Sequence, residues 1–309
     1  MRIVFMGTPE SAVPSLRRLV DNGHEIVAVW TQPDKPAGRG KKLHQSPVKD
    51  FALLHKLPVH QSAKIKTAEA KELFTSHDAE AAIVVAYGRI LPAEFLNAYP
   101  HGCINVHFSL LPKYRGAAPV NWAIVNGEKE TGVTTMKIVQ ELDAGPVLLQ
   151  SATEIGKTET APELMSRLAQ MGADLISETL QKLPTLTLRE QMAEQASFAP
   201  ILKREDGLID WSMDAFAIDR RVRGFQPWPN AHTVFNSKRL IVWEATPENA
   251  ARGPHAAGQI MSVDGGTLMV SAGKSTALRV SSIQLEGSRR MSARDFINGS
   301  HPTAGSQLG

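Results

Sequence analysis

The first half of the chain repeats one pattern, in which short apolar runs alternate with stretches of helical periodicity. Strands are expected at four of these runs, residues 3–6, 26–30, 83–86 and 103–106. The runs lack a regular apolar–polar alternation, which is typical of strands buried on both faces. Buried strands separated by helices predict a parallel sheet covered on both sides. We therefore expect a Rossmann-like α/β domain.

The expected helices of this half have recognisable beginnings. Thr8 can cap a helix with Pro9 at its first position, and Ser46 with Pro47 repeats the device. A β-branched run at residues 131–139 predicts a further strand. A long helix is expected from Thr160 to about residue 180.

The second half contains shorter β-like runs separated by turns. Strands are expected at residues 233–235, 240–243, 259–262, 267–271 and 278–283. Asp264 and Gly265 between two of them predict a hairpin, and a helix capped by Ser212 and closed by Gly224 precedes the strands. About five strands with tight turns predict a small OB-like β-barrel, an architecture that often binds nucleic acid.

These two patterns predict two domains. We expect a Rossmann-like domain at residues 1–183 and an OB-like barrel at 206–309. Between them, Leu-Pro-Thr-Leu-Thr at 183–187 breaks the helical pattern, so residues 184–205 are expected to be a linker. With 309 residues, the chain is long enough for both domains to bury a core.

Composition places the chain among globular proteins, with 42% hydrophobic and 21% charged residues. The formal net charge is only +3, but residues 201–309 carry the whole surplus, with 13 Lys and Arg against 10 Asp and Glu. A small basic surplus is weak evidence for a nucleic-acid partner.

Several features indicate a cytoplasmic protein. The single cysteine, Cys103, excludes an internal disulfide and is expected to be a buried structural thiol. The chain opens on a strand-like run, so no signal peptide is expected before it. The longest uncharged stretch, residues 95–112, contains Asn97 and Pro100 and is a poor membrane span.

Other common chemistries are disfavoured. Gly7-Thr8-Pro9 lacks the glycine spacing of a dinucleotide site, so Gly7 is expected to serve a tight turn. The ten histidines show no metal-ligand spacing, and we expect no metal. No G-x-S-x-G elbow is present, so Ser109 is expected to be a turn residue and no nucleophile.

Asn105 and His107 are two residues apart at the end of a predicted strand. Side chains at this spacing share one face of the sheet, and open α/β folds place their sites at the carboxyl ends of strands. Asp143 follows the next strand, in Leu-Asp-Ala-Gly. It could form a simple Asx turn, or it could hold the imidazole of His107 in place. An amide, an imidazole and a carboxylate together can bind an oxyanion and move a proton.

The connection from Gln32 to Gln45 is unusually long and basic. Loops of this length are functional or solvated. We expect its cations to contact phosphates near the site, together with cations of the second half. The residues expected to contact these phosphates are Arg39, Lys41, Lys42, Lys203, Arg204, Arg220 and Arg223.

Five segments resemble the folate-dependent formyltransferases, and the likeness covers nearly the whole chain. They are residues 105–112 (Asn-Val-His-Phe-Ser-Leu-Leu-Pro), 142–145, 31–42, 86–92 (Ala-Tyr-Gly-Arg-Ile-Leu-Pro) and 224–229 (Gly-Phe-Gln-Pro-Trp-Pro). The first two are shared by the whole family. The basic loop and the second domain are similar to the members that act on methionyl-initiator-tRNA. Phe108 departs from the family pattern of a small residue or proline, and we expect it to alter the packing of the pterin pocket.

The resemblance implies roles for individual residues. Asn105, His107 and Asp143 would be catalytic, and the formyl donor would be 10-formyltetrahydrofolate. The residues expected at the folate site are Ser109, Leu110, Leu111, Pro112, Tyr87 and Gly88. The enzyme would formylate the α-amine of methionyl-initiator-tRNA, and we expect a monomer.

Two alternatives remain at this point. One is a formyltransferase or hydrolase that acts on a small molecule such as a purine precursor or a sugar nucleotide. The other is a non-catalytic RNA-binding protein with a vestigial Rossmann-like part.

Overall fold

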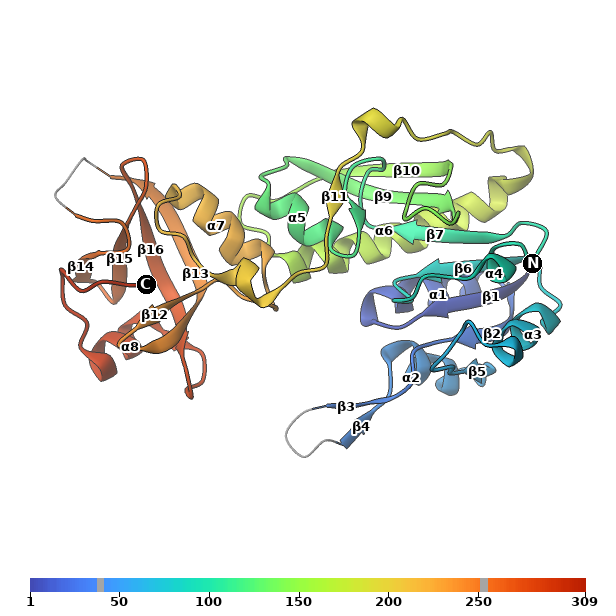
Figure 1. Ribbon diagram of the computed structural model, residues 1–309, viewed down its shortest axis with the longest axis horizontal. Coiled ribbons are helices and arrows are strands. Elements are labelled where there is room, and N and C mark those ends of the chain that lie inside the picture. The colour runs from blue at the N-terminus through green and yellow to red at the C-terminus, as the bar shows by residue number, and fades with distance from the viewer. Residues whose placement is uncertain (38–41, 251–254) are drawn as a thin grey trace. The chain divides into compact units, whose positions relative to one another are not determined.

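The computed structural model describes residues 1–37, 42–250 and 255–309 (Figure 1). The chain divides into two compact units, each built from separate stretches of sequence. The first unit comprises Met1–Gly116, Glu130–Glu154 and Met165–Ala199. The second comprises Ala117–Lys129, Ile155–Leu164 and Pro200–Gly309. No helix among the described residues is long and apolar enough to cross a membrane.

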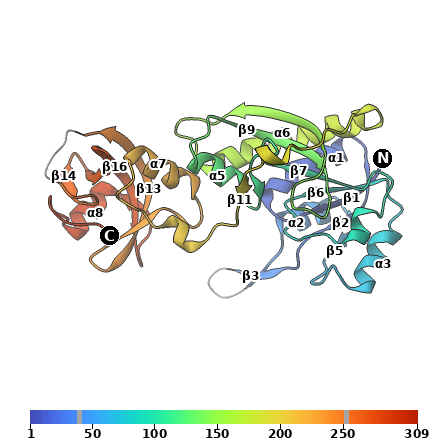
Figure 2. The same cartoon turned by 45° about the horizontal axis from the view of Figure 1, so that its top comes forward.

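The first unit is built on a seven-stranded sheet with the order β10-β9-β7-β6-β1-β2-β5. Its strands are β1 (Arg2–Gly7), β2 (Glu25–Trp30), β5 (Val59–His60), β6 (Ala81–Val85), β7 (Cys103–His107), β9 (Glu130–Lys137) and β10 (Val147–Glu154). The ladders from β5 to β7 are parallel, whereas β9 pairs antiparallel with both β7 and β10. Figure 2 shows these strands side by side.

Helices cover both faces of this sheet, as the absence of alternation predicts. The helices are α1 (Val13–Asp21), α2 (Pro47–Leu54), α3 (Ala68–Ser76), α4 (Ala93–Leu96) and α6 (Ala161–Lys182), the last of which begins in the second unit. On one face, Val84 and Cys103 share a buried cluster with Phe74 of α3 and Phe95 of α4. On the other face, a side chain at Gly172 of α6 would meet Val106 at 2.9 Å.

The first unit also contains three shorter features. Strands β3 (Lys35–Ala37) and β4 (Lys42–His44) form an antiparallel hairpin, and β8 (Arg115–Gly116) pairs in parallel with β11 (Phe198–Ala199). Short 3₁₀ helices lie at Glu10–Ala12, Leu183–Thr185 and Ala193–Gln195.

The second unit is an antiparallel sheet with helices packed on it. Its elements are α5 (Pro119–Val125), a 3₁₀ helix (Arg204–Gly207), α7 (Ala215–Gly224), β12 (His232–Phe235), β13 (Lys238–Asn249), β14 (Ile260–Asp264), β15 (Thr267–Ala272), β16 (Thr276–Leu285), β17 (Met291–Ser292) and α8 (Ala293–Ser300). The strand order is β12-β13-β16-β15-β14, and β17 pairs with β16. The expected Asp264-Gly265 hairpin joins β14 to β15.

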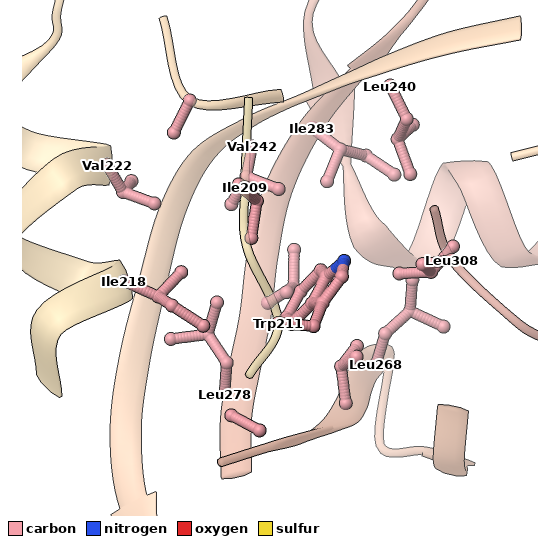
Figure 3. Close-up of a cluster of buried hydrophobic side chains, with 14 of the residues drawn as sticks. Ile209, Trp211, Ile218, Val222, Leu240, Val242, Leu268, Leu278, Ile283 and Leu308 are labelled. Carbon is pink, nitrogen blue, oxygen red and sulfur yellow. The ribbon is translucent and has the colours of Figure 1, made fainter. Parts of the chain in front are cut away.

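The core of the second unit forms around Trp211 (Figure 3). Ile218 and Val222 of α7 lie in the same cluster as Val242 of β13 and Leu278 of β16. Trp211 is buried, and its indole Nε1 donates to the Thr233 hydroxyl at 3.1 Å, so its one polar atom is satisfied. The predicted arrangement, a parallel-sheet α/β domain followed by a β domain, is confirmed.

Two predicted helix beginnings are wrong. Thr8 caps no helix, because its hydroxyl donates to the Tyr87 carbonyl at 3.2 Å and the chain forms a 3₁₀ turn before α1. Ser212 does not cap α7, because its hydroxyl donates to Asp210 and Asp214 caps the helix instead. The Ser46 cap of α2 is confirmed by its hydrogen bond from the Lys49 amide.

Candidate active site

Asn105 and His107 lie at the carboxyl end of β7, on the face of the sheet that Cys103 shares. His107 is only 6% exposed. Asn105 is partly exposed, and its side-chain amide makes no hydrogen bond to the residues that the structure describes. A polar amide that the fold itself does not use is available to a ligand. The sequence-based expectation that these two side chains point the same way therefore matches their position on the strand.

The imidazole of His107 is held by two groups. Its Nε2 lies 2.9 Å from the Tyr114 carbonyl oxygen, and because a carbonyl can only accept, Nε2 carries the proton. Its Nδ1 lies 3.7 Å from Oδ2 of Asp143, which is longer than a direct hydrogen bond. Nδ1 is thus the ring atom that remains for a reacting group or a bridging water.

Asp143 lies in the turn between β9 and β10 and has a left-handed backbone, with φ of 49°. Asp is one of the few residue types that adopt this conformation readily. The turn directs Oδ2 at the Gly116 amide, which donates to it at 2.8 Å, so that only 13% of the side chain is exposed. The segment from Tyr114 to Gly116 therefore contacts both the imidazole and the carboxylate.

The turn Ser109–Pro112 is fixed by two side chains of neighbouring strands. Thr134 of β9 accepts from the Leu111 amide at 3.1 Å and donates to the Ser109 carbonyl at 2.7 Å. Gln150 of β10 donates to the Leu111 carbonyl at 2.8 Å. The buried Ser109 hydroxyl donates to the Lys113 carbonyl at 2.6 Å, which suits the turn role expected for it. Leu110 and Pro112 stay partly exposed.

Two other expected site residues lie after β6 and differ in exposure. Tyr87 is only 2% exposed and belongs to the apolar cluster of the first unit, and this burial raises the pKa of its phenol to about 12. Its carbonyl accepts from Thr8 and from Gln32. Gly88 is exposed beside it. Phe108 is buried, 3.5 Å from where a side chain at Gly172 of α6 would begin.

Comparison with known proteins identifies the family. Residues 1–180 match the formyl transferase family and residues 201–301 match the formyl transferase C-terminal domain. A methionyl-tRNA formyltransferase of Solibacter usitatus is 47% identical over 100% of this chain and 99% of its own length. One of Koribacter versatilis is 49% identical over 100% of the chain and 99% of its own length.

The chain belongs to the methionyl-tRNA formyltransferase family. The predicted family and the predicted enzyme class, a formyltransferase that acts on methionyl-tRNA, are confirmed by these full-length relatives. The small-molecule enzyme and the non-catalytic RNA-binding protein are correspondingly disfavoured.

Solved structures show the same fold at lower identity. The N-formyltransferase of Helicobacter canadensis, solved with folinic acid and dTDP-3-aminofucose, has a TM-score of 0.69 at 20% identity and covers 90% of this chain and 98% of its own. HypX of Aquifex aeolicus, solved with tetrahydrofolic acid, has a TM-score of 0.65 at 17% identity and covers 96% of this chain and 47% of its own.

The basic residues expected at the tRNA interface of this family member are differently placed. Arg39 and Lys41 lie outside the described residues, and Lys42 is in β4. At the base of the hairpin, Asp34 pairs with Lys49 at 2.6 Å, and this contact lowers the pKa of the carboxyl. Asp34 thus pairs with Lys49 of α2, and within the described part of the chain it forms no ion pair with Lys35, the next residue.

Two of the four expected cations in the second unit are exposed and two are engaged. Lys203 and Arg204 are exposed. Arg220 donates to the Val125 carbonyl at the end of α5, at 3.3 Å. Arg223 is 14% exposed, pairs with Asp219 at 2.9 Å and donates to the Glu159 carbonyl. The last two hold parts of the second unit together.

Sequence reasoning missed the residues that support the site from residues 184–205. Gln191 donates to the carbonyls of Asp143 and Gly145, and the Ser197 hydroxyl accepts from the Tyr114 amide. Neither belongs to a motif or a periodic segment, so only their spatial contacts reveal them. Among the described residues, no group of three His, Cys, Asp or Glu side chains is close enough to bind a metal ion.

Proposed function

We propose that the enzyme transfers the formyl group of 10-formyltetrahydrofolate to the α-amine of methionyl-initiator-tRNA, with Asn105, His107 and Asp143 as its catalytic residues. The observation that carries this proposal is the end of β7. There, an amide that bonds no other described residue lies beside a buried imidazole with a carboxylate 3.7 Å from its Nδ1. The proposed roles follow from which atoms of these groups are still available.

In the first step, the unprotonated amine attacks the formyl carbon. A nitrogen–carbon bond forms, and the carbonyl oxygen becomes an oxyanion. The Asn105 amide donates a hydrogen bond to that oxygen. Because the proton on Nε2 is donated to the Tyr114 carbonyl, His107 donates through Nδ1 when both ring nitrogens carry a proton. Preorganised donors of this kind are stronger toward the oxyanion than toward the planar carbonyl, so they lower the barrier.

In the second step, the oxyanion returns to a carbonyl and the bond from the formyl carbon to N10 of the folate breaks. The amine gives up one proton and N10 takes one. Asp143 lies near enough to His107 Nδ1 to pass this proton by way of one water. The folate is consumed as a co-substrate, and no step requires a metal.

The turn Ser109–Pro112 is proposed to form part of the folate site, with Tyr87 and Gly88 beside it. Its backbone is rigid because Thr134 and Gln150 occupy its Ser109 and Leu111 backbone groups. A rigid turn loses little entropy when a ligand binds. Residues 1–183 are proposed to catalyse, 184–205 to link, and 206–309 to bind tRNA. We also propose that the enzyme is cytoplasmic and monomeric. Light scattering of the purified protein tests the oligomeric state.

The proposal is tested with purified full-length protein, 10-formyltetrahydrofolate and charged tRNA. The expected product is N-formylmethionine, released from initiator tRNA by mild base. Methionyl-elongator tRNA is the matched control for tRNA choice, and an amino sugar nucleotide is the control for the small-molecule alternative. Formylation of the sugar nucleotide without formylation of methionyl-tRNA would overturn the proposed function.

A further inference from the structure

Gln191 lies between the two loops that hold the candidate catalytic residues. Its Nε2 donates to the Asp143 carbonyl at 2.8 Å and to the Gly145 carbonyl at 2.7 Å. Its Oε1 accepts from Nε of Arg115 at 3.0 Å. The amide can be oriented in only one way, because the flipped amide would turn its oxygen to two carbonyls and its N–H groups to a guanidinium.

The turn that carries Asp143 depends on this donor. Its carbonyls at Asp143 and Gly145 both accept from the one amide, and Gly145 is buried. A side chain at Gly145 would meet the Lys137 carbonyl oxygen at 1.9 Å, so the backbone of the turn packs directly against the end of β9. Buried carbonyls without a donor cost free energy. Without Gln191 the turn would therefore relax to find other donors.

The same turn sets the position of the Asp143 carboxylate. Its Oδ2 accepts from the Gly116 amide at 2.8 Å and lies 3.7 Å from Nδ1 of His107. A shift of the turn by a fraction of an ångström would change both distances. Because catalysis depends steeply on such distances, a residue that only fixes the turn can control the rate.

The Oε1 atom of Gln191 binds the second loop, residues 114–116, through Arg115. Arg115 is buried, and its guanidinium reaches Gln191 and, at 3.4 Å, Glu141. Its amide donates to the Ser197 carbonyl at 2.8 Å. At Gly116, φ is +127° and a side chain would meet the Ala199 carbonyl at 2.5 Å, so β8 and β11 lie in close contact. Residues 191–199 therefore contact both loops that surround His107.

We infer that Gln191 is a positioning residue of the formyl-transfer reaction, and that it acts by holding the Asp143 turn. The inference rests on the proposed catalytic role of Asp143. It assigns part of the catalytic machinery to residues 184–205, where the sequence predicts only a linker.

Two substitutions separate the contacts of Gln191. Gln191→Met keeps the length and shape of the side chain and removes its hydrogen bonds to the Asp143 and Gly145 carbonyls and to Arg115. Gln191→Glu still accepts from Arg115 but, when ionised, cannot donate to the Asp143 turn. We expect both to lower kcat by about 10²-fold, with the KM for folate changed by less than about twofold. Gln195→Met is the matched control, because the exposed Gln195 side chain bonds only the Met192 sulfur among the described residues.

A double-mutant cycle distinguishes positioning from general structural support. If Gln191 acts through Asp143, Gln191→Met should cost less than about threefold in an Asp143→Asn background. If Gln191 had a merely structural role, the decreases in kcat caused by the two substitutions would multiply in the double variant. Normal kcat for Gln191→Glu, or full multiplication in the cycle, would overturn the inference.

Crystal structures of the parent and of Gln191→Met decide the inference even if the reaction is different. We expect the Asp143 carboxylate to leave its contact with the Gly116 amide in the variant. An unmoved carboxylate would overturn the inference. A parent protein that does not formylate methionyl-tRNA would overturn the proposed function alone.

Discussion

The end of β7 in the first unit and helix α7 in the second both carry polar residues that the sequence marks as functional, yet their side chains are in different situations. At β7, the Asn105 amide bonds no other described residue, and Nδ1 of His107 faces Asp143 at 3.7 Å. On α7, Arg223 already pairs with Asp219 and binds a backbone carbonyl. Residue type alone therefore does not indicate a site, whereas leftover hydrogen-bonding capacity does.

The largest effect that this comparison predicts is the loss of catalysis at β7. His107→Ala and Asp143→Asn should each lower kcat by about 10²–10³-fold, because the first removes a donor to the developing oxyanion and the second removes the carboxylate that passes the proton. Both variants should melt cooperatively near the parent temperature. Steady-state kinetics with saturating substrates measure the loss, and near-normal turnover in either variant would remove that residue from the catalytic set.

At α7, substitution should change stability and not binding. Arg223→Ala leaves Asp219 largely buried without its partner, and burial already raises the pKa of this carboxyl. We expect a loss of about 2 kcal/mol in the free energy of unfolding, measured by denaturant titration, with little change in tRNA affinity at temperatures where the variant is folded.

Arg279→Ala is the matched control for this experiment. Arg279 makes a bidentate pair with Glu248, but both side chains are more than a third exposed. An exposed ion pair contributes little to stability, so its removal should lower the free energy of unfolding by less than about 1 kcal/mol. If Arg223→Ala keeps its stability and has a lower tRNA affinity instead, the distinction between the two regions is wrong.

A third prediction concerns how rigid the folate turn must be. Thr134→Val removes the hydroxyl that binds the backbone of Ser109 and of Leu111, and we expect folate affinity to fall about tenfold. Thr135→Val is the control, since Thr135 is the next residue on β9 and its hydroxyl bonds Thr179 of α6 and the Leu149 backbone of β10 and does not bond the folate turn. Calorimetric titration with a tetrahydrofolate analogue measures both. Equal affinities in the two variants would contradict a folate site at this turn.

Much of the fold follows from patterns that are local in the sequence. The non-alternating runs predict the parallel strands, and the Asn105–His107 spacing places two side chains on one face of β7. Helix caps are harder to place, because two capping residues often stand close together. Ser212 and Asp214 are both good caps, and the structure uses Asp214 since Asp210 already binds the Ser212 hydroxyl.

Support for the site could not be predicted, because it depends on contacts between distant residues. Gln191 and Asp143 are 48 residues apart, and residues 184–205 have no periodicity that would place them against a sheet. The engagement of Arg223 was accessible in principle, since Asp219 lies four residues before it on the same helix. Local patterns thus indicate the proposed reacting groups, whereas the groups that hold them depend on contacts between distant residues.

The smallest expected effect belongs to the exposed cations of the second unit. Lys203 and Arg204 precede and begin a 3₁₀ helix, and Arg204 lines one hollow with Arg239 and Gln284. Burial lowers the pKa of Arg239, and the nearby charge of Arg204 adds to this, so an anion between the two guanidiniums would relieve their repulsion.

Replacing Lys203 and Arg204 together by alanine should reduce the slope of log affinity against log salt by about one for each phosphate that the pair neutralises, and leave kcat unchanged. Binding of tRNA over a range of salt concentrations measures the slope, with Arg279→Ala as the control that removes one exposed arginine already paired to a carboxylate. An unchanged slope in the double variant would show that exposure is no better guide to the tRNA surface than residue type.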